Sequence, residues 1–468
     1  MTMYSVVGVR SLLFVLGLIY SVSGAFQWDE ARDCPFLKID CHCVNQFEID
    51  CSGRDLSHVP VSHYAPWSYR VINLRNNRIT QLRRTDFSNI NVSEVLLDRN
   101  YINFIENGAF QNLRSDLRLL DLENNELTYL PPELGTLNKL ESLDLRGNSI
   151  TSIGFNDAIM RQIGDYMRTF YFGHAQLDAW PNTTRHFQQL RQLELYGGNM
   201  SELPISAFQG FEWTLQELAI RNTQLISVPI ALQNVHSVEI FHFDDNTLVG
   251  DAGILAPAFA GMVYTVKTLT LEHDGLTDFP DILLTLQKVQ NLSLARNNLE
   301  FVSDASVQKI ASTDLIILNL EQCDLDRIPG ALSQLNSLLE LDLSNNRIHT
   351  IERNDLQRLA KIQNLTLNNN PVAYISNSSF GELSALQRLE MRNTELNLVP
   401  EAIRNIPNLQ MVDLSTPMPR IECNCDRMIW LYHLLQVNRG LVINGECETI
   451  AISIQEYAVR RVPDYCNP

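Results

Sequence analysis

The sequence is poor in long apolar runs. Its one extended apolar run covers residues 11–20, about ten residues, whereas a helix that spans a bilayer needs roughly twenty. Small residues follow at 21–25, which is typical of the cleavage site of a secretory signal peptide. We therefore expect residues 1–25 to be a signal peptide and expect no membrane span. The polar residues 461–468 also lack the hydrophobic tail of a lipid-anchor signal.

Positive charge is also scarce. The chain has 36 Lys and Arg against 54 Asp and Glu, which gives a net charge of −18 at pH 7. Such a surface repels phosphate backbones and anionic lipids, and no local strip of basic residues offsets it. We therefore expect no nucleic-acid partner.

Catalytic motifs are absent as well. The sequence has no nucleophile elbow, no phosphate-binding loop and no His-Glu-x-x-His helix. The densest set of candidate metal ligands could hold a divalent cation if the side chains converged, and it comprises His242, Asp244, Asp245, Glu272 and His273. Exposed residues of these types are more often simply solvated. We predict no enzyme activity, no metal and no cofactor.

Internal repetition dominates the rest of the chain. Alignment on Leu-x-x-Leu-x-Leu-x-x-Asn-x-Leu gives fifteen copies, of which residues 140–150 and 338–348 are clear examples. The second leucine-type position of these copies falls at Ile72, Val95, Leu120, Leu143, Phe170, Leu193, Leu218, Phe241, Leu269, Leu292, Leu318, Leu341, Leu365, Leu389 and Val412. Alternation in the Leu-x-Leu segment puts the leucines on one face of a short strand. One strand cannot bury them alone, so the copies must stack and share a core.

The Asn position of the motif has its own physical reason. An amide that turns inward where the strand ends can satisfy backbone groups inside the core. The copies that have this residue carry it at Asn77, Asn100, Asn125, Asn148, Asn246, Asn297, Asn346 and Asn370. The copies that depart from it have Ala175, Gly198, Thr223, Asp274 and Thr394, and we expect the ladder of side-chain hydrogen bonds from coil to coil to be weaker there.

The spacing of the copies alternates between short and long. Several short copies carry an apolar residue followed by proline, as at Leu130-Pro131 and Ile328-Pro329. Longer copies insert extra residues, such as 157–164. This pattern predicts small helical turns on the convex side of alternate coils.

These repeats resemble the extracellular leucine-rich-repeat proteins with cysteine-rich caps, such as the Slit, Toll-ectodomain and small-proteoglycan solenoids. The resemblance implies an α/β fold, a right-handed horseshoe with a parallel β-sheet on its concave face. Short helical, 3-10 and irregular segments would form the convex face. We expect an N-terminal cap at 26–66, about fifteen repeats at 67–420 and a C-terminal cap at 421–468.

Eight of the nine cysteines flank the repeats, four on each side. Clustered cysteines can also bind zinc, but Cys-x-Cys is not the usual zinc spacing and a secreted chain oxidises its thiols. Disulfides are therefore predicted, and spacing alone leaves three connectivities for each cluster. The family resemblance implies first-to-third and second-to-fourth pairing, which gives Cys34–Cys43, Cys41–Cys51, Cys423–Cys447 and Cys425–Cys466. It also implies that Trp430 packs a short helix of the C-terminal cap.

The ninth cysteine, Cys323, falls on the Asn position of its repeat. That side chain points inward, and the motif tolerates Cys there. We predict a buried free thiol rather than a reactive thiol or an intermolecular bridge.

A candidate binding surface lies on the strands of repeats five to nine. Aromatic residues and arginine on a rigid, exposed surface are typical anchors of protein interfaces. The predicted ligand-binding residues are Tyr171, His174, Tyr196, Arg221, His242, Asp244, Glu272 and His273, with Glu217 and Asp245 beside them. A lateral or convex site, or a merely solvated surface, remains the alternative.

Six Asn-x-Ser/Thr sequons predict glycosylation, and they lie at Asn91, Asn182, Asn199, Asn291, Asn364 and Asn377. By register, Asn291 and Asn364 fall on concave strands of repeats ten and thirteen. A glycan there would bar a protein from the later part of the concave face and leave the first nine repeats open.

The sequence therefore predicts a secreted protein of the extracellular space or matrix that binds an extracellular protein. Adhesion, matrix, guidance and innate-immune roles are all typical of the resemblance. A secreted inhibitor that wraps a target enzyme is the alternative. Neither the ligand nor the oligomeric state follows from the sequence.

Overall fold

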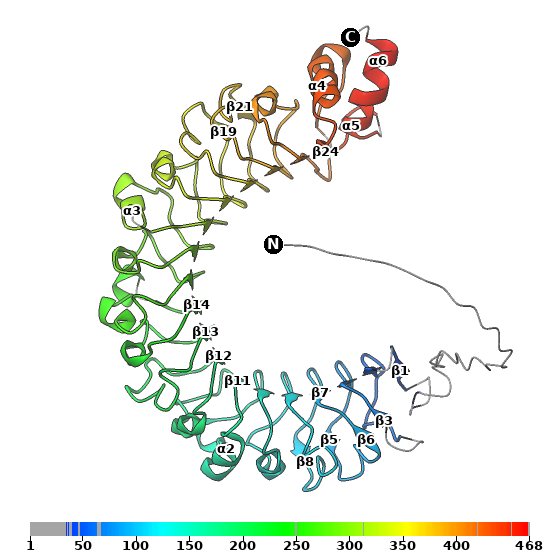
Figure 1. Ribbon diagram of the computed structural model, residues 1–468, viewed down its shortest axis with the longest axis vertical. Helices are drawn as coiled ribbons and strands as arrows, with labels where there is room; N and C mark the ends of the chain where they lie inside the picture. Colours follow the sequence, from blue (N-terminus) through cyan, green and yellow to red (C-terminus); the bar gives the residue numbers. More distant parts are fainter. Residues whose placement is uncertain are drawn as a thin grey trace, which may run out of the picture.

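The computed structural model describes residues 34, 36, 40–44, 47–62, 67–248, 250–311, 313–418, 420–450 and 452–466. The predicted signal peptide, residues 1–25, lies outside these ranges. The coils stack along an arc with the strands on its inner side and the helices α2 and α3 on its outer side (Figure 1). This is the predicted horseshoe solenoid. In the described ranges, no helix combines the length and the apolar character that crossing a membrane requires.

The concave face is a single sheet of 18 strands. Its first strand, β1 (His42–Cys43), pairs antiparallel with β2, and every later neighbour pairs in parallel. The parallel strands, in spatial order, are β2 (Glu48–Asp50), β4 (Val71–Asn73), β7 (Glu94–Leu96), β9 (Leu119–Asp121), β10 (Ser142–Asp144), β11 (Thr169–Phe172), β12 (Gln192–Tyr196), β13 (Glu217–Arg221), β14 (Ile240–Asp244), β15 (Thr268–Thr270), β16 (Asn291–Ser293), β17 (Ile317–Asn319), β18 (Glu340–Asp342), β20 (Asn364–Thr366), β22 (Arg388–Glu390), β23 (Met411–Asp413) and β24 (Val442–Asn444).

The register of this sheet follows the repeat alignment. The fifteen second-leucine positions pair with one another in unbroken order, from Ile72 opposite Val95 to Leu389 opposite Val412. The row continues beyond the repeats, because Ile49 pairs with Ile72 and Ile443 pairs with Val412. Each cap thus adds a strand to the end of the stack and covers its apolar edge.

The inward-facing amides form the expected ladder. Asn148 is 1% exposed. Its Nδ2 donates to the carbonyls of Leu122 (2.8 Å) and Leu145 (3.0 Å), and its Oδ1 accepts from the amide of Leu127 (3.0 Å). One side chain therefore satisfies three buried backbone groups, each of which would otherwise cost about 1–3 kcal/mol. The same pattern recurs at the other Asn positions.

Strands β12, β13 and β14 are five residues long, whereas most strands of the sheet have three. The strand hydrogen bonds thus continue to Tyr196 opposite Arg221, and to Arg221 opposite Asp244. The copies of β12 and β13 lack the asparagine, but that of β14 keeps Asn246, and β15 and β22 have three residues although their copies lack it. Strand length in this middle third therefore does not simply follow the loss of the asparagine. Aromatic rings fill the core beneath this part of the sheet, including Phe170 and Phe172 with stacked centroids 5.0 Å apart.

The convex side carries short helices. Six 3-10 turns directly follow a proline, namely η1 (Pro132–Thr136), η3 (Asn182–His186), η4 (Ile230–Asn234), η7 (Asp281–Leu284), η8 (Gly330–Gln334) and η9 (Glu401–Asn405). The longer coils hold η2 (Ser152–Gly154), α2 (Asp157–Ile163), η5 (Gly250–Gly253), η6 (Ala256–Phe259) and α3 (Asp304–Gln308). The prediction that helical turns occupy alternate coils is therefore wrong for the middle repeats. Proline fixes a backbone angle that suits a helix start, so the short coils form a turn as well.

Three small parallel sheets outside the concave face join neighbouring coils. They pair β3 (Trp67–Ser68) with β6 (Ile90–Asn91), β5 (Gln81–Leu82) with β8 (Phe104–Ile105), and β19 (Thr350–Ile351) with β21 (Tyr374–Ile375). They occur in coils without the helices described above.

Disulfides close both caps. The structure contains Cys34–Cys43, Cys41–Cys51, Cys423–Cys447 and Cys425–Cys466, the four pairs that the family resemblance implies. The C-terminal cap adds the helices α4 (Cys425–Val437), α5 (Ile454–Glu456) and α6 (Val462–Tyr465), with the π-helical turn η10 (Tyr457–Arg461) between the last two. Trp430 of α4 is buried, as expected. Four disulfides require an oxidising compartment, so the protein is extracellular.

The ninth cysteine is buried and free, as the sequence predicts. Cys323 is 0% exposed, and its Sγ donates to the carbonyl of Leu294 at 3.3 Å. Burial raises the pKa of the Cys323 thiol to about 12. The side chain thus takes the inward place of the motif asparagine as an unreactive thiol.

Candidate functional site

The predicted ligand-binding residues lie on or just after neighbouring strands β11 to β15. Tyr171 of β11, Glu194 of β12, Ala219 of β13, His242 of β14 and Thr270 of β15 form one cross-strand row. Tyr196, Arg221 and Asp244 form a second row at the carboxyl ends of the strands. His174 follows β11, and Glu272 and His273 follow β15. We call the surface formed by these two rows and these three flanking residues the central concave patch.

Exposure differs strongly within the patch. Tyr196 is 44% exposed, whereas Asp244 is only 5% exposed. Asp244 therefore lies beneath the surface, although the sequence pattern places it among exposed contact residues. It accepts a hydrogen bond from Nε of Arg221 (3.0 Å) and another from the hydroxyl of Thr270 (2.6 Å). Asp244 therefore holds Arg221 and Thr270 in place rather than contacting a ligand itself.

Arg221 is held between two strands. Besides Asp244 on β14, its guanidinium reaches Oε1 of Glu194 on β12 at 3.3 Å. Glu194 is 7% exposed. Because both carboxylates are buried, they hold the Arg221 guanidinium in a defined position. The guanidinium lies in the row that also contains the exposed ring of Tyr196.

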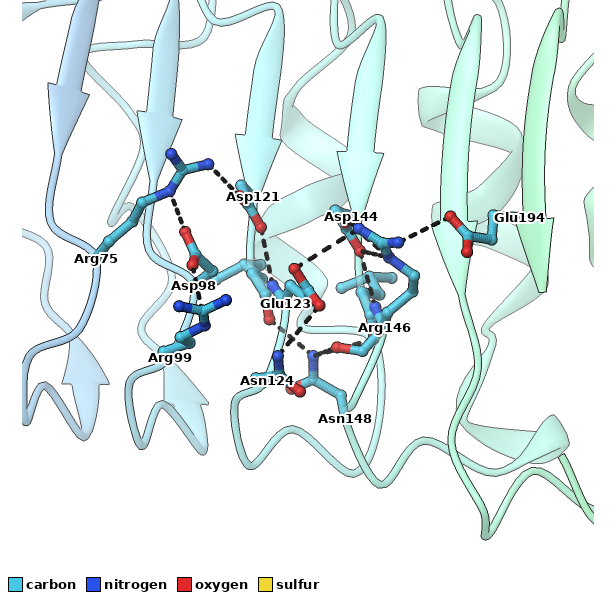
Figure 2. A network of polar contacts seen from close by, with 12 residues as sticks. Arg75, Asp98, Arg99, Asp121, Glu123, Asn124, Asp144, Arg146, Asn148 and Glu194 are labelled. Atoms are coloured by element: carbon cyan, nitrogen blue, oxygen red, sulfur yellow. Dashed lines mark hydrogen bonds and ion pairs between the residues drawn. The ribbon is translucent and has the colours of Figure 1, made fainter. Parts of the chain in front are cut away.

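A longer chain of ion pairs extends this arrangement toward the N-terminus (Figure 2). Arg146, which follows β10, contacts Asp144 at 2.6 Å, Glu194 at 2.8 Å and Glu123 at 3.6 Å. It also lies 5.0 Å from the centroid of the Tyr171 ring, a cation–π distance. The ring of Tyr171 is thus held over the same network. Burial raises the pKa of Asp144 to about 6, against the opposing effect of Arg146.

The first three repeats contain a similar arginine bridge between carboxylates. Arg75 bridges Asp98, with which it makes a close ion pair, and Asp121, at 3.0 Å (Figure 2). Sequence reasoning missed Asp98, Asp121, Asp144, Arg146 and Glu194 as members of a network. The available signal was the recurrence of acidic and arginine side chains at the two variable positions that follow each second leucine.

The histidines of the patch have separate partners. Nδ1 of His242 lies 2.8 Å from the hydroxyl of Thr270, and Nδ1 of His273 lies 2.7 Å from Asp245. Burial and the charge of Arg221 lower the pKa of His242, so its ring is neutral at pH 7. Of the five candidate metal ligands considered in the sequence, His273 and Asp245 contact each other, His242 and Asp244 both contact Thr270, and Glu272 contacts Arg296.

Only one acidic or histidine cluster in the described ranges has a spacing compatible with a cation. It consists of Asp121, Glu123 and Asp144, whose ligand atoms lie within 4.8 Å of one another. Arg75 already contacts Asp121, and Arg146 contacts Glu123 and Asp144. Guanidinium groups therefore supply the positive charge that these carboxylates need, and we assign no metal to them.

The sequons fall on several faces. Asn291 begins β16 and Asn364 begins β20, both half-buried on the concave side, where Nδ2 of Asn291 donates to Thr268 (3.2 Å) and Nδ2 of Asn364 donates to Glu340 (3.0 Å). Asn182, Asn199 and Asn377 are exposed. Asn91 ends β6, and its Oδ1 is buried without a hydrogen-bond partner. Glycosylation of these residues stays a prediction.

Comparison with known proteins agrees with this architecture. The leucine-rich-repeat family model matches residues 90–150 and 313–372. Lumican of Rattus norvegicus is 25% identical over 317 residues, which cover 64% of this chain and 87% of lumican. Podocan-like protein 1 of Homo sapiens is 26% identical over 330 residues, which cover 68% of this chain and 60% of that protein.

A solved structure of TLR13 in complex with ssRNA13 superimposes with a TM-score of 0.64 and 18% sequence identity, over 87% of this chain and 67% of that one. At this identity the likeness concerns the fold alone. The fifteen repeats in register, the two disulfide-bonded caps and these matches together show a leucine-rich-repeat solenoid with cysteine-rich caps at both ends.

Proposed function

We propose that the protein binds an extracellular protein through the central concave patch. The observation that carries this proposal is the exposed ring of Tyr196 beside Arg221, whose guanidinium is fixed between two buried carboxylates. Tyr and Arg are enriched among the residues that dominate binding energy. A side chain that is already ordered loses little entropy on binding, which favours affinity.

The chemistry of the patch favours a protein over other partners. TLR13 binds ssRNA13 in its solved complex, but this chain carries a net charge of −18 and its concave arginines are paired with carboxylates. RNA would meet repulsion rather than a basic groove. Catalysis is not part of the proposal, because Asp244 and Glu194 are bound to Arg221, His273 to Asp245 and His242 to Thr270.

A glycan placed at the edge of the patch tests the proposal. His174→Asn combined with Gln176→Thr creates an Asn-x-Thr sequon just after β11, where both substituted positions are outside the core. Gln176→Thr alone provides no acceptor asparagine and is the matched control. In affinity capture from extracellular fluid, a protein retained by the wild type and by the control should be lost from the glycosylated variant.

Single substitutions give the second readout. Tyr196→Ala should weaken retention of that protein by about 2 kcal/mol if Tyr196 is an anchor, and should leave the melting temperature unchanged because the ring is exposed. Tyr374→Ala removes a similarly exposed ring (54%) from the outer side of a later coil and serves as its control. Retention by the glycosylated variant at wild-type affinity would exclude the concave patch. A single retained enzyme whose activity is blocked would identify the inhibitor alternative.

A further inference from the structure

A second surface lies where the chain passes from the concave strands to the convex helices. Residues 300–304 of repeat ten, residues 325–331 of repeat eleven and Asp355 of repeat twelve line an open pocket of about 750 Å³. Its lining includes Glu300, Phe301, Asp304, Asp326, Arg327 and Gly330. We call it the acidic flank pocket.

The pocket combines an exposed aromatic ring with carboxylates that lack basic partners. Phe301 is 63% exposed. Among the described residues, no basic side chain lies within ion-pair distance of Glu300, Asp304 or Asp326, although ion pairs are common elsewhere on this chain. Arg327 is the one cationic residue of the lining. The negative field of these carboxylates, offset by this single arginine, thus surrounds an exposed apolar ring.

The equivalent place in the second and third repeats provides an internal comparison. A pocket of about 400 Å³ is formed there around Phe104, which stands nine residues after its second leucine position, as Phe301 does. At the positions of Glu300, Asp304 and Asp326, the earlier coils have Asn103, Asn107 and Thr128, respectively. Pro132 stands at the position of Gly330. The earlier lining has one carboxylate, Glu106, whereas the later lining has four, Glu300, Asp304, Asp326 and Asp355. The later pocket is therefore larger and more acidic than its counterpart.

We propose that the acidic flank pocket binds an extended protein segment that carries arginine or lysine. Three carboxylates without a basic partner attract such a side chain, and the ring face of Phe301 can accept the cation by a cation–π contact. Phenylalanine also provides apolar area for the aliphatic stem of the basic side chain. The pocket is distinct from the central concave patch, so this inference neither depends on the proposed function nor tests it.

Gly330 makes a clean blocking variant available. A Cβ built on this glycine meets no atom within 4 Å, and its backbone is not in the left-handed region. Gly330→Arg should therefore fold and place a tethered guanidinium at the pocket, where it competes with the ligand. Gly330→Ala adds only a methyl group and is the matched control.

The probe is a fluorescein-labelled peptide in which arginine and lysine alternate with glycine, and binding is followed by fluorescence anisotropy on the full secreted chain. We expect the affinity to fall about three- to fivefold with Phe301→Ala, and by a similar factor with Glu300→Gln combined with Asp326→Asn. Gly330→Arg should reduce it at least as much, and Gly330→Ala should leave it unchanged. The same peptide with glutamine in place of every basic residue should not bind.

Controls must separate the pocket from the general negative charge. Asp165→Asn with Glu202→Gln removes the same charge from exposed positions elsewhere, and Phe104→Ala removes the equivalent ring of the earlier pocket. Both should preserve the affinity. Equal losses in the control and pocket variants would show non-specific attraction and overturn the proposal, as would a peptide that does not bind the wild type.

Discussion

The central concave patch and the acidic flank pocket both gather carboxylates, but they surround those carboxylates differently. In the concave sheet, Arg146 and Arg221 each lie between acidic groups of different coils. In the flank pocket, Glu300 and Asp326 have no basic partner among the described residues. The comparison separates charge that connects the coils from charge that is available to a ligand. Formal charge alone would not distinguish the two.

The largest effect on stability should come from replacing an arginine that contacts carboxylates of several coils. Arg146→Met keeps an unbranched side chain but leaves Asp144 (9% exposed) without its cation and Glu194 (7% exposed) with Arg221 alone. Breaking a buried pair in this way costs about 3 kcal/mol, so the melting temperature should fall clearly. Thermal unfolding followed by circular dichroism measures it.

The matched control is Arg347→Met. Arg347 pairs with Asp324, but their side chains are 60% and 40% exposed. Exposed pairs contribute less than about 1 kcal/mol, so this variant should melt close to the wild type. Similar losses in both arginine variants would show that burial does not distinguish the concave network from an ordinary surface ion pair.

Sequence reasoning predicts the solenoid well because each coil repeats the same physical requirement. Leucines at fixed spacing must be buried, and an inward asparagine must hydrogen-bond the backbone groups that the turn leaves unpaired, as Asn148 does. The ion pairs do not follow from such a local pattern. Arg146 meets Glu194 across 48 residues, two coils away, and whether they meet depends on coil lengths and on the extra backbone pairing of β12 to β14. Both residues occupy variable positions of the motif.

The flank pocket is hidden from the sequence for a related reason. Its carboxylates come from three coils and occupy positions at which the motif sets no preference. Only the arrangement of neighbouring coils brings Gly330 and Phe301 into one pocket lining. In the smaller, earlier pocket, Pro132 occupies the position that corresponds to Gly330. The candidate residues of the central patch could be chosen from the sequence because they flank the strand leucines. Their burial could not be, as Asp244 demonstrates.

A third kind of carboxylate tests the distinction further, because Asp274 is buried without any cation. It occupies the Asn position of repeat nine and is 1% exposed. Its Oδ1 accepts from the amide of Asn246 at 2.8 Å, whereas its Oδ2 has no hydrogen-bond partner. Burial raises the pKa of Asp274 from 3.8 to about 8. The side chain is therefore largely protonated at neutral pH and resembles the amide that it replaces.

Asp274→Asn should stabilise the protein, with a gain that depends on pH. The unfolded chain loses this proton near pH 4 and the folded chain near pH 8, so the wild type loses stability as pH rises between these values. Asparagine does not titrate and carries a donor at every pH, so its advantage over aspartate appears as the carboxyl ionises. Melting temperatures of the two proteins should be similar near pH 4 and should differ most at and above pH 8. A constant difference across that range would show that Asp274 is ionised throughout.

The smallest effect on stability is expected from the flank carboxylates. Glu300→Gln with Asp326→Asn removes two charges that contact no basic group among the described residues, and both side chains are exposed. Surface changes of this kind usually alter the free energy of unfolding by no more than about 0.5 kcal/mol. The double variant should thus have the melting temperature of the wild type but a lower affinity for the basic peptide. A large drop in its melting temperature would mean that these carboxylates hold the coils together, as those around Arg146 do, and the contrast between the two surfaces would disappear.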